Sequence, residues 1–60
     1  MMNKIDELLT PKEVSEVLKV NVNTVYIWLR EEKIKSVRVG DLWRVRRSDL
    51  DDFINAKQNT

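Results

Sequence analysis

The 60-residue sequence contains no cysteine and no histidine. Without cysteine the chain can form neither a disulfide nor a thiolate metal site, and without histidine it lacks the usual zinc ligand and the usual imidazole base. With a single glycine it also has no glycine-rich phosphate loop. The acidic residues stand near predicted helix starts, where capping explains them. The sequence therefore predicts a protein that is not an enzyme and that has no metal, cofactor or small-molecule substrate.

Long apolar runs are missing as well. No run approaches the ~20 residues that a membrane-spanning helix needs, and the N-terminus lacks the apolar segment of a signal peptide. We therefore expect a cytoplasmic protein with no membrane partner. A chain this short cannot form two separate hydrophobic cores, so we expect one domain over residues 1–60, with a core between about residues 8 and 56.

The formal net charge of +1 hides an uneven distribution of charge. Residues 1–32 carry four basic and six acidic residues, residues 33–47 carry six basic and one acidic, and residues 48–60 carry one basic and three acidic. The central segment therefore has a positive field that the total conceals. On charge alone, a solvated hairpin is the better interpretation of this segment.

The first predicted helix covers residues 11–19. Thr10 can cap it, Pro11 suits the first helical position, and Glu13 completes a capping box. Apolar residues follow at the i, i+3 and i+4 positions of a helix with one buried face. These residues are Val14, Val17 and Leu18.

A second helix is predicted over residues 22–32, with Asn21 as its cap. Val25, Trp28 and Leu29 repeat the i, i+3, i+4 spacing of a buried face. Only two or three residues separate the two helices, and such a short gap forces the sharp corner of a helix-turn-helix.

Residues 36–46 alternate apolar and basic side chains around Gly40, which predicts a β-hairpin. A two-residue loop, Gly40-Asp41, would put Arg38 on the same face as Trp43. A three-residue loop over residues 40–42 would separate the two kinds of side chain. Because a one-residue slip inverts the faces, we expect the three-residue loop. It places Val37, Val39, Trp43 and Val45 on one face and Arg38, Arg44 and Arg46 on the other.

A third helix is predicted to open at Ser48, which can act as its cap, with acidic residues near the positive end of the helix dipole. Leu50, Phe53 and Ile54 give this helix a buried face. The order helix, helix, hairpin, helix predicts a mainly α fold with a small β-hairpin.

An exposed stripe remains on the second predicted helix once the core positions are removed. Its members are Asn23, Tyr26, Ile27 and Arg30, which are neighbours at i, i+3, i+4 and i+7. A helix of this length is roughly 16 Å long, and its diameter suits the major groove of B-DNA, which is about 12 Å wide. Asn23 can then read an adenine edge, and Ile27 or Val22 can touch a thymine methyl group. The residues on this helix of types that bind phosphate oxygens are Thr24, Tyr26 and Arg30.

Each of these residues also has a structural interpretation. Asn23 can bond to the local backbone, and Tyr26 can pack half-buried. Ile27 is either an ordinary exposed apolar residue or a protein contact. A readout helix followed by a basic hairpin nevertheless favours DNA, because the hairpin can reach phosphates or the adjacent minor groove. The basic residues expected there are Lys33, Lys35, Arg38, Arg44 and Arg46.

Four motifs occur in order: LTPKEV at residues 9–14, NVNTVYIWLR at 21–30, VRVGDLWRV at 37–45 and SDL at 48–50. Together they resemble the excisionase family of MerR-like winged helix-turn-helix DNA-binding domains. The resemblance implies a recognition helix and a wing, with roles in DNA recombination as a phage or transposon excision factor, or in transcription regulation. It implies that Val22, Asn23, Tyr26 and Ile27 lie on the recognition helix, and that the wing is built around Arg38, Gly40 and Arg44.

The sequence departs from the family pattern at four positions. Family members commonly have glycine where Lys19 and Glu32 stand, at helix ends that favour a left-handed backbone. They often carry a basic residue where Ile27 and Leu42 stand. These two apolar residues suggest an alternative function, a protein–protein interaction module that uses Ile27 and Leu42 as anchors.

A domain of this size covers few base pairs and offers little binding surface. We therefore expect further copies of the chain on repeated sites, or a second DNA-bound protein such as an integrase, to add affinity through effective concentration.

Overall fold

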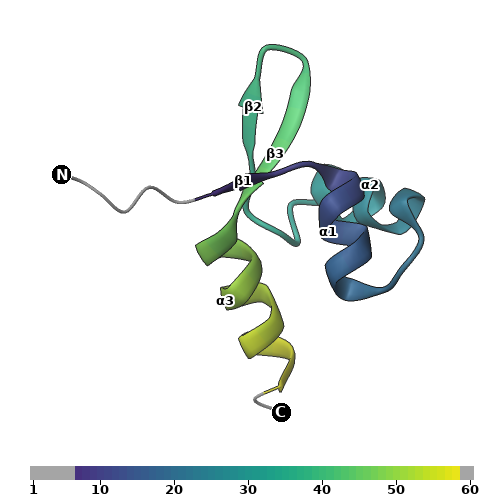
Figure 1. The fold of residues 1–60 in the computed structure, drawn as a ribbon, viewed down its shortest axis with the longest axis vertical. Coiled ribbons are helices and arrows are strands. Elements are labelled where there is room, and N and C mark those ends of the chain that lie inside the picture. Colours follow the sequence, from purple (N-terminus) through teal and green to yellow (C-terminus); the bar gives the residue numbers. More distant parts are fainter. Residues whose placement is uncertain (1–6, 59–60) are drawn as a thin grey trace, which may run out of the picture.

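The structure, a computed structural model, describes residues 7–58. Its elements are β1 (Leu8–Leu9), α1 (Pro11–Leu18), α2 (Val22–Arg30), β2 (Val37–Val39), β3 (Leu42–Arg46) and α3 (Arg47–Gln58). The β2–β3 hairpin, called the wing below, stands out from the body, α3 runs in the opposite direction, and α1 and α2 lie together beside them (Figure 1). This arrangement confirms the predicted winged helix-turn-helix.

The start of α1 is built as the sequence predicts. The backbone N–H of Glu13 donates to Oγ1 of Thr10 over 3.0 Å, and the backbone N–H of Thr10 donates to Oε1 of Glu13 over 2.9 Å. Pro11 occupies the first helical position, where its missing N–H leaves no bond unmade. The capping box is therefore confirmed, and it fixes the direction in which α1 leaves β1.

The predicted buried face of α1 is wrong at one position. Val17 is 43% exposed, whereas Ser15 is buried and its Oγ donates to the carbonyl oxygen of Lys12 over 2.6 Å. At ~100° per residue, Val17 and Ser15 lie on opposite sides of Val14 around the helix. The helix turns the Ser15 side inward, so Val17 faces outward.

The α1–α2 turn depends on one cap and one left-handed residue. Oδ1 of Asn21 accepts from the backbone N–H of Asn23 over 2.8 Å, which confirms Asn21 as the cap of α2. Lys19 has φ of 59° and Glu32 has φ of 60°, the two left-handed positions expected from the family pattern. Each helix ends before its left-handed residue, so α2 is two residues shorter than predicted.

Lys19→Gly is expected to raise the thermal midpoint of unfolding by a few degrees. The left-handed backbone costs a residue with a side chain roughly 1–2 kcal/mol, of which glycine's extra freedom in the unfolded chain cancels about 0.5–1 kcal/mol. Circular dichroism melts measure the difference. Glu16→Gly is the control, because Glu16 lies exposed within α1 and glycine there should lower the midpoint. An unchanged or lower midpoint for Lys19→Gly would contradict the account of this turn.

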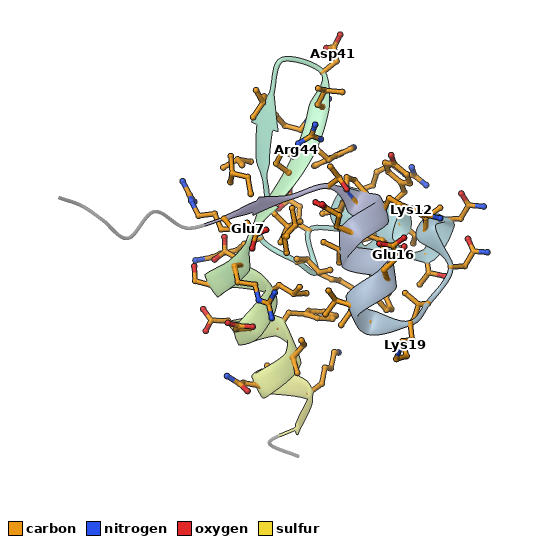
Figure 2. All side chains as sticks on the ribbon, viewed as in Figure 1. Glu7, Lys12, Glu16, Lys19, Asp41 and Arg44 are labelled. Carbon is orange, nitrogen blue, oxygen red and sulfur yellow. The ribbon has the colours of Figure 1, made fainter. Side chains whose placement is uncertain are left out.

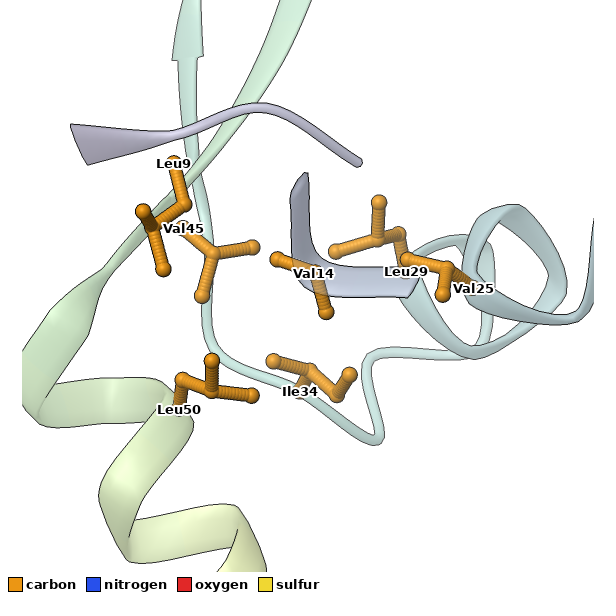
Figure 3. Close-up of a cluster of buried hydrophobic side chains, with 7 residues drawn as sticks. All are labelled: Leu9, Val14, Val25, Leu29, Ile34, Val45 and Leu50. Carbon is orange, nitrogen blue, oxygen red and sulfur yellow. The ribbon is translucent and has the colours of Figure 1, made fainter. Parts of the chain in front are cut away.

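The hydrophobic core joins every element except β2 (Figure 3). Its buried members are Leu9, Val14, Val25, Leu29, Ile34, Val45 and Leu50. Trp28 and Trp43, both predicted in the core, are half-buried and pack against it. The centroids of the Trp28 and Phe53 rings are 5.4 Å apart, a contact between α2 and α3.

The register of the wing differs from the prediction. Val39 pairs with Leu42, Arg38 with Trp43 and Val37 with Arg44, so the loop is the two-residue Gly40-Asp41. Arg38 therefore lies on the face of Trp43 and Val45, opposite to Arg44. The expected separation of all apolar from all basic side chains does not occur.

Turn chemistry explains this register. Gly40 has φ of 62° and Asp41 is not among the described residues with positive φ, a combination that suits a type II′ turn with glycine first. The burial that usually fixes register acts only at the base of the wing, where Val45 is buried, while Val39 and Leu42 are 52% and 54% exposed. In the part of the wing beyond the core, the type of turn therefore determines the register of the two strands.

The start of α3 and the edge of the sheet also correct the sequence analysis. The helix begins at Arg47, directly after β3, so Ser48 lies inside it rather than capping it. The backbone N–H of Arg47 donates to the carbonyl oxygen of Glu7 over 2.9 Å. The short strand β1, which was not predicted, pairs with β3 and completes a sheet in the order β1-β3-β2. Leu50, Phe53 and Ile54 form the buried side of α3, as predicted.

Candidate nucleic-acid interface

The outward stripe of α2 is defined by Asn23, Tyr26, Ile27 and Arg30. Three of its members are exposed, and Tyr26 is half-buried against the core. The opposite side of the helix is fully used in packing, because Val25 and Leu29 are 0% and 1% exposed. The other two candidates on α2, Val22 and Thr24, are half-buried. The stripe is therefore a surface with little role in holding the fold together.

Asn23 stands in the first turn of α2, but it is not the residue that caps this helix. Its backbone N–H is bonded to the side chain of Asn21, which does the capping. Within residues 7–58 the Asn23 amide group makes no hydrogen bond. The local-backbone interpretation of Asn23 does not hold, and its donor and acceptor are both available to a ligand.

A surface hollow of about 740 Å³ lies where the end of α2 meets the wing. Four of its lining residues are cationic: Arg30, Lys35, Arg38 and Arg46. Glu32 and Asp49 also line it, so cations outnumber acids two to one. Because Arg30 belongs to both the outward stripe and this hollow, the two form one continuous surface.

The wing contributes Arg38 to this hollow through a contact that the sequence analysis missed. The guanidinium carbon of Arg38 lies 4.2 Å from the centre of the Trp43 ring, a cation–π contact. Nη2 of Arg38 also donates to the carbonyl oxygen of Asp41 over 3.4 Å. Trp43 therefore serves both as a packing residue and as a platform for Arg38. The signal for it was the Gly-first loop, whose two-residue register puts Arg38 opposite Trp43.

Arg44 lies on the other face of the wing. It is half-buried, and its Nη1 donates to the carbonyl oxygen of Trp43 over 2.6 Å. Figure 2 shows Arg44 midway along the wing, with Asp41 at the tip. Strand alternation puts Arg46 on the face of Arg44, yet Arg46 also lines the hollow, because β3 ends there and turns into α3. The structure therefore brings four predicted cations together but separates Arg44 from them.

The remaining candidate cation, Lys33, is engaged in an exposed ion pair. Its Nζ lies 3.4 Å from Oε1 of Glu31, and the two side chains are 58% and 52% exposed. Pairs of this kind contribute about 0–1 kcal/mol and exchange readily with solvent or another anion. Lys33 lies next to the hollow in sequence but does not line it.

The two apolar residues that depart from the family pattern lie on different surfaces. Ile27, 44% exposed, is on the outward stripe of α2. Leu42 is on the wing face of Arg44, together with the exposed Val39. The two apolar residues therefore belong to different elements of the fold, α2 and the wing.

Among residues 7–58, no three acidic side chains are grouped where a metal ion could bind. No helix in this range is long and apolar enough to span a membrane.

Comparison with known proteins places the chain in a family. A family model described as a helix-turn-helix domain matches residues 8–58. Neither the search of curated proteins nor that of solved structures returned a significant match. Members of the family are typically non-enzymatic, and a domain of this kind suggests binding to double-stranded DNA. The chain therefore belongs to the helix-turn-helix domain family, which is typified by excisionase-like and MerR-like domains.

Proposed function

We propose that this protein binds double-stranded DNA with sequence preference and has no enzymatic activity of its own. The observation that carries the proposal is the continuity between the outward stripe of α2 and the cation-lined hollow beside the wing, which share Arg30. One part offers side chains that can read bases, and the other offers charges that can bind phosphates. Both are needed to recognise a particular duplex.

In this proposal α2 lies in the major groove. Its nine residues give a rod about 14 Å long, and the diameter of a helix with its side chains, about 10–12 Å, matches the groove width of about 12 Å. Asn23 and Ile27 then face the bases, with Val22 at the helix start beside them. Asn23 can donate to and accept from an adenine edge, because its amide has no bond within the described residues.

The phosphate contacts come from the rim of this surface. Arg30, Lys35 and Arg38 contact one strand of the backbone next to the groove, joined by Lys33 and Arg46. The hydroxyl groups of Thr24 and Tyr26 add hydrogen bonds to phosphate oxygens. Arg44, on the opposite wing face, reaches the second strand when the wing lies along the minor groove, so that each face of the ribbon meets one wall of that groove.

The biological role that we propose is that of an excisionase-like recombination directionality factor or a small transcriptional regulator. In both roles a domain this small gains affinity from further copies on repeated sites, or from a second bound protein such as an integrase.

The test is a fluorescence anisotropy titration of a labelled random-sequence duplex over a range of salt concentrations. Each neutralised phosphate should steepen the fall of log affinity by about 0.9 per log unit of salt, so the six cationic contacts proposed here give a slope of about −5. Absence of binding at low salt, or affinity that does not change with salt, would contradict the proposal. The first of these results would favour the protein–protein interaction module.

A further inference from the structure

Ile27 is a large apolar side chain that the fold does not use. It is 44% exposed, while Val25 and Leu29, two residues away on either side, are buried at 0% and 1%. A β-branched residue is a slightly poorer helix former than alanine, leucine or arginine. Ile27 therefore adds little to the core and nothing to the helical propensity of α2. What Ile27 contributes is an apolar side chain on the surface that α2 presents to a ligand.

The neighbours of Ile27 on the stripe are polar. The distance between Asn23 and Ile27 along the helix axis is close to the distance between base pairs two steps apart. Asn23 precedes it by one turn and Arg30 follows it by one turn, both exposed. Asn23 and Ile27 are about 6 Å apart along the helix axis, roughly two base-pair steps of 3.4 Å. The only cation on the stripe is Arg30, at the end of α2 and beside the hollow. Ile27 thus occupies the middle of the stripe, where a duplex bound to α2 would present bases rather than phosphates.

The chemistry of the major groove leaves one partner for such a side chain. Guanine, adenine and cytosine present polar atoms there, and only thymine adds a C5-methyl group. Against the other three bases, isoleucine would remove water from polar atoms without replacing their hydrogen bonds. Against thymine it buries a methyl group instead.

We propose that Ile27 makes this protein selective for a thymine methyl group in the major groove. Val22, the other apolar residue at the start of α2, is half-buried and has less surface to offer. This inference rests on the proposed DNA binding, and it adds the base feature that is recognised. A thymine about two base pairs from the adenine read by Asn23 is the preferred target.

The experiment begins with selection of bound duplexes from a random-sequence pool. Each thymine of the selected site is then replaced, one at a time, by deoxyuracil, which removes only the methyl group. At one position, loss of the methyl group should weaken binding by the wild-type protein about fourfold. This is the change in affinity expected when the burial of one CH₂ group is lost. The Ile27→Ala variant should bind the thymine and uracil duplexes equally well.

Val17→Ala is the matched control. Val17 is as exposed as Ile27, at 43% against 44%, but lies on α1. This variant should keep both the affinity and the preference for thymine, and circular dichroism should show that both variants are folded.

The outcomes separate the two proposals. The role of Ile27 is wrong if no thymine-to-uracil change in the selected site weakens binding. It is also wrong if the Ile27→Ala variant still loses as much affinity as the wild type when the methyl group is removed. Both results leave DNA binding intact. A pool that yields no preferred sequence also overturns the role of Ile27. If no duplex binds at low salt, the proposed function itself fails and this inference fails with it.

Discussion

Replacement of Arg30, Lys35 and Arg38 together by alanine is expected to weaken binding to duplex DNA by on the order of a hundredfold at 0.1 M salt. Each phosphate contact contributes about 0.9 log unit of affinity for every tenfold drop in salt concentration, so loss of three contacts reduces the salt slope by about 2.7. All three side chains are exposed and line the same hollow. Their removal should therefore affect binding far more than folding. Anisotropy titrations at several salt concentrations measure both quantities.

The matched control removes three positive charges from elsewhere on the surface. Lys12 lies on α1 and Lys19 directly follows its end (Figure 2), and Lys57 lies near the end of α3. A Lys12→Ala, Lys19→Ala, Lys57→Ala variant has the same net charge as the first variant. It should lose little affinity and keep most of the salt slope. Equal losses in the two variants would mean that binding follows net charge, and the proposed surface would be wrong.

Leu29→Ala is expected to destabilise the fold by about 2–5 kcal/mol, the usual cost of removing a fully buried leucine side chain. Leu29 is 1% exposed and lies beside Val14 and Val25 in the core (Figure 3). A domain of this length has a total stability of only about 3–9 kcal/mol. A large part of the Leu29→Ala protein should therefore be unfolded at room temperature. Denaturation by urea, followed by circular dichroism, measures the loss.

Leu42→Ala is the comparison for this prediction. Leu42 is 54% exposed on the outer face of the wing, and surface substitutions usually change stability by less than about 0.5 kcal/mol. If Leu42→Ala proved as damaging as Leu29→Ala, Leu42 would have to pack against the body, which would contradict its exposed position on the wing.

Local rules predicted the first half of the fold well. The capping box of Thr10 and Glu13 and the cap at Asn21 each depend on interactions within a few residues. Interactions between residues this close in sequence can be predicted from the sequence, because the spacing of the two residues in the helix is enough to bring them together. The helix-turn-helix follows from them.

The incorrect predictions, the register of the wing and the buried face of α1, both depended on which side chains are buried. Alternation of apolar and basic residues suggested a wing with one buried face, but the wing extends beyond the core and only Val45 is buried there. The Gly40-Asp41 turn then decides the register, and Arg38 joins the Trp43 face. The Val17 error has the same origin, since periodicity does not say on which side of Val14 the core lies.

The exposure of most of the candidate side chains could be predicted from the sequence, but their arrangement in space could not. The outward stripe of α2 follows from helical spacing and was correctly expected to be largely free of core packing. The hollow that joins it to the wing requires the relative position of α2 and the hairpin, which is set by residues distant in sequence, such as Leu29, Ile34 and Val45. The separation of Arg44 from Arg38 follows from the same register change.

The most direct test of the DNA-binding surface is an NMR titration of the ¹⁵N-labelled protein with a duplex recovered by selection. Amide signals from Val22 to Arg30, those of Lys35 and Arg38, and the indole N–H of Trp43 should shift as DNA is added. Amides in the second half of α3 should stay in place. Shifts that gather on α3, or on the outer face of α1 around Glu16, while α2 and Trp43 remain unchanged, would contradict the account.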